Sequence, residues 1–245
     1  MNDVALRFER LAKTYEGAAA LVDFSLEVRR GECVALVGVN GAGKTTLIKC
    51  LLDFCDADQG RIEIFGTTHR EPPARARLAY LPERFNPPYY LTGRDFLRYM
   101  LQLYGAPFDE QRVISMFAAL DLDREALDRP ARTYSKGMTQ KLGIAACLLS
   151  ARELYVLDEP AGGLDPKARA LFKRELRALH RGGSTVFFTS HALIDVAELC
   201  ERVAVLHDGR LLFAGTPDEL VRRHGGADLE QAFLDCIAAP GQAAA

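Results

Sequence analysis

One segment constrains the fold more than any other: a nearly continuous apolar run at residues 32–37 that leads through a glycine-rich loop into a helical pattern at 46–53. The loop reads Gly-Val-Asn-Gly-Ala-Gly-Lys-Thr-Thr over residues 38–46 and satisfies G-x-x-x-x-G-K-[ST]. Such a loop turns consecutive backbone N–H groups inward, and the helix that comes after it adds the positive end of its dipole. The segment therefore predicts strand, phosphate-binding loop and helix.

The side chains at the end of this loop match the chemistry of a nucleoside triphosphate. Lys44 supplies a point charge for the phosphates, and the Thr45 hydroxyl is a ligand for Mg²⁺. The alternative is an ordinary glycine-rich turn, which the strand-to-helix context disfavours. The expected nucleotide-binding residues are Gly38, Asn40, Gly41, Ala42, Gly43, Lys44, Thr45 and Thr46.

The remaining pattern indicates an α/β fold: a P-loop NTPase core with a mainly parallel sheet, an N-terminal antiparallel β layer and an inserted helical subdomain. We expect strands at 78–81, 154–158 and 185–189, and an antiparallel pair at 7–13 and 21–29. We expect helices at 92–104, 109–122 and 135–149, and two short helices after residue 217 succeeded by a tail that frays.

These elements predict a single domain over residues 1–245. Its nucleotide-binding core is expected at 1–83 and 151–216, its helical subdomain at 84–150 and its C-terminal helical tail at 217–245.

Composition excludes several classes of protein. The formal net charge is −2 and the charges are mixed along the chain, so no nucleic-acid surface is expected. Six cysteines occur without a C-x-x-C pair, which predicts reduced, packed thiols. No apolar run reaches the roughly 18 to 20 residues of a membrane helix. We therefore expect a cytoplasmic chain whose membrane work belongs to a partner.

A second motif, which consists of two adjacent carboxylates, comes directly after the apolar run at 154–157. Asp158 at the strand end is expected to hold Mg²⁺. Glu159 is expected to point to the opposite side, by the two-residue period of a strand, and to orient or deprotonate water. A surface turn is the alternative for this motif taken alone.

From residue 6 to about residue 234 the chain resembles the nucleotide-binding subunits of ATP-binding cassette (ABC) proteins. The segment Tyr-Ser-Lys-Gly-Met-Thr-Gln at 134–140 is similar to the family's signature loop, Leu-Ser-Gly-Gly-Gln. Ser135 and Gly137 match, whereas Lys136 and Met138 depart from the common form. The resemblance implies that Ser135 grips the γ-phosphate of ATP bound to an opposite subunit, while the residue pattern alone leaves Ser135 as a helix N-cap.

Four further positions acquire roles from this resemblance. His191 matches the switch histidine that contacts the γ-phosphate, Asp165 the loop that joins the two sites of a dimer, and Tyr15 the aromatic residue that stacks on adenine. Glu83 stands where many members have a glutamine that senses Mg²⁺, so its ligation of the metal is an open question. Each of the other three positions also has a purely structural alternative. His191 could be a structural histidine, Asp165 an N-cap before Pro166, and Tyr15 an ordinary residue of the sheet.

The resemblance implies an ATPase that uses ATP and Mg²⁺, with catalytic residues Glu159 and His191. It implies a second copy of the chain or a homologous ATPase subunit as one partner, and integral membrane permease subunits on separate chains as the other. The chain would then lie on the inner face of the cell membrane, with exposed aromatic residues at 86–90 near the permease. The branch resembles exporters of the multidrug, sodium, polysaccharide or cofactor-assembly type; importers are the runner-up.

Two other interpretations compete with the transporter. A soluble ABC ATPase that acts on ribosomes or DNA remains open, although such proteins usually carry a second cassette or a long coiled coil. A P-loop kinase would leave the Ser135 loop and His191 without a role. The transported substance is not encoded in this chain, because it contacts the permease.

Overall fold

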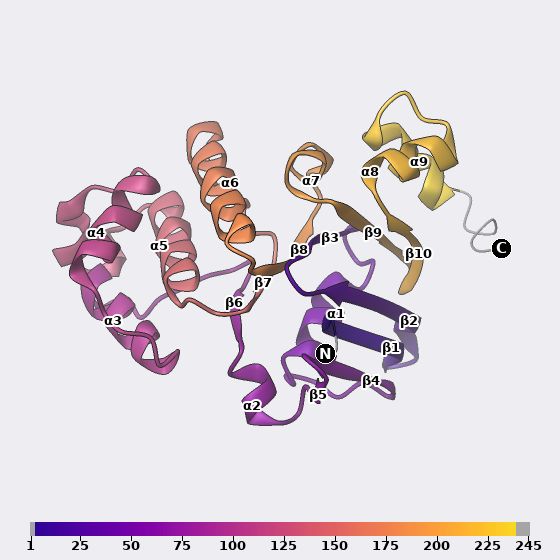
Figure 1. Cartoon of the computed structure of the whole chain (residues 1–245), viewed down its shortest axis with the longest axis horizontal. Helices are drawn as coiled ribbons and strands as arrows, with labels where there is room; N and C mark the ends of the chain where they lie inside the picture. The colour runs from indigo at the N-terminus through magenta and orange to yellow at the C-terminus, as the bar shows by residue number, and fades with distance from the viewer. Residues whose placement is uncertain (1–2, 239–245) are drawn as a thin grey trace. The chain divides into compact units, whose positions relative to one another are not determined.

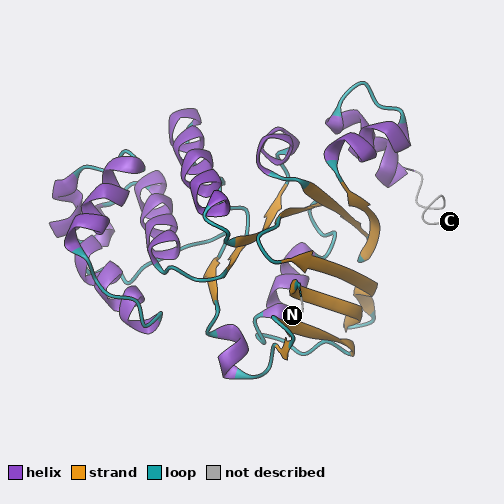
Figure 2. Ribbon diagram, viewed as in Figure 1, coloured by secondary structure: helices purple, strands orange, loops and turns teal. Residues whose placement is uncertain are grey.

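The computed structural model describes residues 3–238 as two compact units (Figure 1). Unit 1 combines residues up to Arg77 with those from Thr185 onward, and unit 2 runs from Leu78 to Ser184. Figure 2 shows that strands dominate unit 1 and helices dominate unit 2. Each unit thus has its own strands and its own helices.

Unit 1 contains an antiparallel sheet in the order β2-β1-β4-β5. Its strands are β1 (Val4–Tyr15), β2 (Ala18–Arg29), β4 (Gln59–Ile64) and β5 (Thr67–Thr68), with the short helix α2 (Pro72–Arg75) after them. Side chains alternate between the two faces, so in the second half of β2 Phe24, Leu26 and Val28 are buried and the residues between them are exposed. The predicted antiparallel β layer is confirmed.

The second sheet of unit 1 has the order β10-β9-β3-β8. Strand β3 (Cys33–Val37) lies between β8 (Thr185–Ser190) and β9 (Arg202–His207) and is parallel to both, while β10 (Arg210–Gly215) is antiparallel to β9. Every residue of β3 and β8 is buried, as a parallel sheet requires. Phe8 of β1 packs against Phe187 of β8, with ring centroids 5.9 Å apart, and so joins the two sheets.

The described residues of unit 1 form four helices besides α2. They are α1 (Lys44–Leu51), α7 (Leu193–Leu199), α8 (Pro217–His224) and α9 (Leu229–Ala238). The last two confirm the predicted pair of short helices; the predicted fraying of the tail beyond them falls on residues 239–245, outside the described part of the chain.

Unit 2 pairs the parallel strands β6 (Leu78–Leu81) and β7 (Leu154–Leu157). Its helices are α3 (Gly93–Leu103), α4 (Glu110–Ala119), α5 (Lys136–Leu149), α6 (Pro166–Arg181) and two 3₁₀ turns, η1 (Arg124–Asp128) and η2 (Ala131–Thr133). Helices α3 and α4 both pack on α5, whose residues from Gln140 to Leu149 are buried. Figure 1 shows this bundle in magenta and pink.

The predicted bounds were wrong in detail where no side chain marks the boundary. Helix α1 begins at Lys44, two residues before the predicted start at Thr46. Its N-cap is Gly43, which has no side chain to mark the boundary in the sequence. The predicted strand 154–158 ends at Leu157, and strand 185–189 extends to Ser190. Strand β4 was missed, since its first residues Gln59-Gly60-Arg61 are polar and exposed.

Candidate functional site

The glycine-rich loop lies in unit 1 between β3 and α1. Lys44 is buried, and its ammonium donates to the carbonyl oxygens of Gly38, at 2.6 Å, and Val39, at 3.4 Å. The lysine thus folds back over the loop that precedes it. Thr45 is exposed and Thr46 is half-buried. The loop therefore presents a positive charge and a hydroxyl at the start of a helix.

Glycines in the loop allow its backbone to pack closely against neighbouring strands. A β-carbon built on Gly38 would overlap the carbonyl oxygen of Leu206, so the loop passes directly against β9. Gly43 has φ +112°, and a β-carbon there would lie 2.5 Å from the carbonyl oxygen of Ala20. Gly43 is also the N-cap of α1 and has no side chain to occupy the helix N–H groups. No cap side chain therefore competes with an anion for these donors.

His191 leaves the sheet at the same edge as this loop. In the parallel pairing of β3 with β8, Val37 is opposite Ser190, so Gly38 and His191 each come directly after the last paired residue. His191 is exposed and lines a cavity of about 490 Å³ together with Ile194 and Glu230, which belong to α7 and α9. The structure thus brings together the predicted phosphate loop and the predicted switch histidine.

Tyr15 is the last residue of β1, and its side chain is 43% exposed. Its hydroxyl donates to Cys55 Sγ at 3.4 Å, and the Lys13 ammonium lies 5.3 Å from the ring centroid. The ring is a strand residue, as the structural alternative required, and it is accessible for stacking, as the adenine role requires. The role of Tyr15 in nucleotide binding stays a prediction.

Asp158 and Glu159 lie in unit 2, directly after β7. The backbone N–H of Asp158 donates to Leu81 O at 2.8 Å, and the Asp158 side chain is buried. Glu159 has φ +46°, in the left-handed region, and its carbonyl oxygen accepts from Gly162 N at 3.0 Å. The two-residue period of a strand therefore does not set the direction of Glu159, and that argument was wrong because β7 ends at Leu157.

Glu83 lies near the acidic pair through strand pairing within unit 2. Leu81 of β6 is opposite Leu157 of β7, so the segments that carry Glu83 and Asp158 leave the two strands at the same edge. The neighbouring Tyr80 reports this charge: burial, reinforced by the carboxylates of Asp158 and Glu83, raises its pKa to about 12. The sequence analysis did not identify Tyr80 as a neighbour of these carboxylates.

Each unit, taken separately, offers an oxygen donor that suits magnesium. The Thr45 hydroxyl and the carboxylate of Asp158 are hard ligands of the kind that Mg²⁺ accepts alongside phosphate oxygens and water. The residues present therefore fit the metal that the loop predicts.

Ser135 is the N-cap of α5, and its hydroxyl accepts from Met138 N at 3.2 Å. Its side chain is exposed, so the cap does not bury the hydroxyl. The helix start also lies beside the loop after β7: Gln140 Nε2 donates to Pro160 O at 3.1 Å. A β-carbon built on Gly163 would lie 3.1 Å from Lys136 Cε, so the lysine stem covers this glycine.

Asp165 caps α6, where its carboxylate accepts from Ala168 N at 2.8 Å and Pro166 occupies the first helical position. The predicted capping role is confirmed. The predicted role of Asp165 in joining two sites of a dimer stays a prediction.

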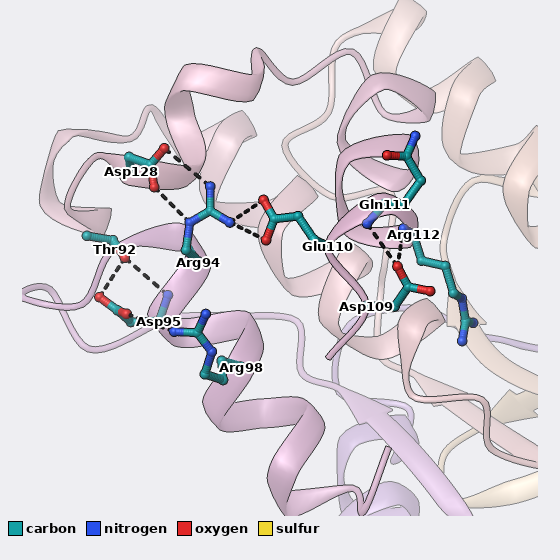
Figure 3. A network of polar contacts seen from close by, with 9 residues as sticks. All are labelled: Thr92, Arg94, Asp95, Arg98, Asp109, Glu110, Gln111, Arg112 and Asp128. Carbon is teal, nitrogen blue, oxygen red and sulfur yellow. Dashed lines mark hydrogen bonds and ion pairs between the residues drawn. The ribbon is translucent and has the colours of Figure 1, made fainter. Parts of the chain in front are cut away.

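A polar network joins α3, α4 and η1 within unit 2 (Figure 3). Arg94 of α3 donates through Nε to Asp128 Oδ1 of η1 at 2.8 Å, and through Nη1 to Glu110 of α4. Thr92 caps α3 and accepts from Asp95 N at 3.1 Å. The network fixes the position of α3 against α4 and η1. The segment directly before α3 carries Tyr89 and Tyr90, whose side chains are 69% and 64% exposed.

Comparison with known proteins gives the family. A family described as "ABC transporter" matches residues 21–162. The Nod factor export ATP-binding protein I of Ralstonia nicotianae is 33% identical over 241 residues, which cover 96% of this chain and 74% of that protein. An uncharacterised ABC transporter ATP-binding protein of Synechocystis is 37% identical over 213 residues, or 86% of this chain. The chain therefore belongs to the ABC transporter family, among its ATP-binding subunits.

Solved structures agree with this fold. The structure of an ATP-binding subunit of an ABC transporter is 31% identical, has a TM-score of 0.87 and covers 95% of this chain and 99% of its own. A dimeric ATP-binding cassette bound to ADP and Pi, 20% identical, has a TM-score of 0.78 over 86% of this chain and 98% of its own, and supports the fold alone.

The chain spans 60% of the length of the first two curated proteins that it matches. Of the helices formed by residues 3–238, none has both the length and the apolar character needed to cross a membrane.

Proposed function

We propose that this chain binds and hydrolyses ATP as the motor subunit of a membrane transporter whose permease is a separate polypeptide. One observation carries the proposal: the loop at 38–46 turns its backbone around the Lys44 ammonium at the start of α1. An uncapped helix N-terminus beside a buried lysine is a site for phosphate groups.

Each residue of the proposed site has one task. Lys44 neutralises the phosphates, the Thr45 hydroxyl and Asp158 hold Mg²⁺, and Tyr15 stacks on adenine. The metal, when bound, neutralises charge that develops on the β- and γ-phosphate oxygens. Glu159 accepts a proton from the attacking water or orients it, and His191 donates a hydrogen bond to the γ-phosphate. Glu83 contributes a further carboxylate for the same metal.

The proposed working form is a head-to-tail pair of these subunits, two copies of this chain or this chain with a homologue. The exposed Ser135 hydroxyl and the N–H groups that begin α5 would complete the phosphate site of the opposite subunit. Closure on ATP and separation after phosphate release supply the motion that a permease can use. Asp165 would link the two sites.

Exposed aromatic residues support the membrane partner. Tyr89, Tyr90, Tyr99 and Leu103 are 50–69% exposed on α3 and the segment before it. Large rings in this position are suited to anchor a protein interface. The chain would thus work at the inner face of the membrane. The named relatives that export Nod factors favour an exporter over an importer, and the family match favours a transporter over a factor that acts on ribosomes or DNA.

The test is the variant Glu159→Gln. It keeps the size and shape of the side chain but lacks the base, so it should bind ATP, remain dimeric with ATP and lose at least about 100-fold in phosphate release. Sedimentation with ATP and Mg²⁺ measures the dimer, and a phosphate assay measures turnover. Glu125→Gln, a matched change at an exposed position in η1, should behave as the unaltered chain does. Rapid ATP hydrolysis by Glu159→Gln would contradict the assignment of Glu159 as the base.

A further inference from the structure

Two thiols meet at the end of the helix that begins at the phosphate loop. Cys50 lies within α1 and Cys55 in the loop after it, and their Sγ atoms are 3.6 Å apart. Cys50 is fully buried and Cys55 is half-buried, so one thiol of the pair is reachable from solvent. The other close pair among the described cysteines, Cys33 and Cys200 at 3.9 Å, is buried on both sides.

The chain at this point turns back on the helix and so brings the thiols together. Asp53 adopts φ +61°, and Phe54 N donates to Lys49 O at 2.9 Å, which closes the end of α1. A disulfide needs an S–S distance of about 2.05 Å, so the sulfur atoms must approach by about 1.5 Å from their 3.6 Å separation.

Cys55 is also the contact between this loop and Tyr15. The Tyr15 hydroxyl donates to Cys55 Sγ at 3.4 Å. The Lys13 ammonium, 5.3 Å from the Tyr15 ring centroid and 2.9 Å from Asp58, closes the other side of the cluster. The position of the Tyr15 ring thus depends on the reduced Cys55 sulfur.

We propose that Cys50 and Cys55 are a redox modification site: a hydroperoxide converts them to a reversible disulfide, which frees Tyr15 from Cys55. Cys55 attacks the terminal oxygen of the hydroperoxide, the O–O bond breaks, and an alcohol or water leaves as Cys55 becomes a sulfenic acid. The Cys50 sulfur then displaces the hydroxyl group, which departs as water with the Cys50 proton. The pair loses two electrons to the peroxide, and a dithiol reductant restores both thiols.

The order of these two steps is set by exposure. Burial raises the pKa of the Cys50 thiol to about 12, so this thiol is protonated near neutral pH and is shielded from the oxidant. Cys55 is the accessible partner and reacts first. The short distance between the thiols then favours the disulfide over further oxidation of Cys55.

The effect on nucleotide rests on the proposed adenine role of Tyr15, whereas disulfide formation itself does not depend on that role. Loss of the stacking ring should lower ATP affinity by about fivefold or more. Reduction should restore the affinity.

The experiment treats the full chain with equimolar hydrogen peroxide and then with dithiothreitol. Mass spectrometry of unreduced peptides should find a Cys50–Cys55 link, and titration with a fluorescent ATP analogue should show the reversible loss of affinity. In Cys55→Ser both responses should vanish, while Cys200→Ala, a change in the buried pair, should keep both. A lower degree of folding in a variant would show in its circular dichroism, and Cys55→Ala then serves as the second substitution.

The two proposals fail in different ways. A stable sulfinic acid at Cys55 without a link to Cys50 would overturn the modification site. A complete link with unchanged ATP affinity would overturn the control of Tyr15. If the reduced chain bound no ATP at all, the proposed function would fail, and the peptide map would still decide whether the disulfide forms.

Discussion

The backbone of Glu159 lies in a region that L-residues rarely occupy. Its φ of +46° costs of the order of 1 kcal/mol, and the hydrogen bond from Gly162 N to its carbonyl oxygen holds the turn in place. Strain of this kind persists where surrounding structure determines it, and it concentrates at functional positions. Eight other described non-glycine residues also have positive φ, so the assignment of Glu159 as a catalytic residue rests on the motif and not on this strain.

His69 makes the unfolding free energy depend on pH. It comes directly after β5, is buried, and its Nδ1 lies 3.2 Å from Ile62 O. Burial lowers the pKa of His69 below 6.5, so the folded state favours the neutral ring. The stabilisation that the neutral His69 ring gives to the folded state is fully present above the pKa of the unfolded chain, about 6.5. It is lost as the pH falls from there through the lower pKa of the folded state.

Urea unfolding at about pH 7.5 and pH 5.5 tests this contribution. The drop in unfolding free energy between the two values should be smaller in His69→Gln than in the unaltered chain. An equal drop in both proteins would show that another group carries the dependence.

At the scale of elements, the helix starts that carry a side-chain cap were predictable. Thr92, Asp109, Ser135 and Asp165 each accept a hydrogen bond from the first turn of their helix, and each was expected at that boundary. Helix α7 and strands β9 and β10 were not predicted. Ala192, the N-cap of α7, supplies no side-chain oxygen, so the local sequence signal was absent.

The role of Ser135 can be separated from its cap. In Ser135→Asp the new carboxylate retains a helix cap, so the unfolding free energy should stay within about 0.5 kcal/mol of the unaltered chain. Its charge would repel the γ-phosphate of an opposite subunit, and ATP hydrolysis should fall at least about tenfold. Ser135→Ala loses the cap and should be destabilised by about 1 kcal/mol.

Urea denaturation and a phosphate-release assay on the same preparations measure the two effects. If Ser135 were only an N-cap, Ser135→Asp would hydrolyse ATP at the normal rate.

Arg94 should stabilise the helical subdomain. It joins α3 to both α4 and η1 (Figure 3), so Arg94→Ala leaves two carboxylates, Glu110 and Asp128, without this partner. The expected loss is about 1 kcal/mol, because the side chain is only 21% exposed and binds two partners at once. Arg98→Ala, where the cation is 55% exposed and 3.8 Å from Asp95, should change little.

The measurement for this pair is thermal unfolding at low and high salt. The difference between the two variants should shrink as salt rises, because screening weakens ion pairs at partly exposed positions. A loss in Arg98→Ala equal to that in Arg94→Ala would contradict the network.

For the whole molecule, the exposed tyrosines provide a test of the membrane partner. The double variant Tyr89→Ser and Tyr90→Ser should keep ATP affinity but reduce recovery of an integral membrane protein from detergent extracts by at least about fivefold. Phe54→Ser is a matched control, since Phe54 is 69% exposed, as Tyr89 is, but belongs to unit 1. Equal recovery of the membrane protein by the tyrosine variant and the control would show that Tyr89 and Tyr90 do not belong to the interface.

The sequence predicted the fold class and the local motifs well, because the phosphate loop, the strand ends and the capped helices are each encoded by neighbouring residues. It did not predict contacts between residues that are distant in sequence. The pairing of Val37 with Ser190, which brings Gly38 and His191 to one edge, needs the strand order. The contact of Lys136 with Gly163 and that of Tyr15 with Cys55 need tertiary packing.

The parallel sheet of unit 1 has a consequence for synthesis. Strand β3 leaves the ribosome early, yet its neighbours β8 and β9 are translated only after the whole of unit 2. A nascent chain therefore carries an entirely apolar segment with both hydrogen-bonding edges vacant. Slow or interrupted translation should favour aggregation, and a chaperone that shields residues 33–37 should raise the yield of folded protein.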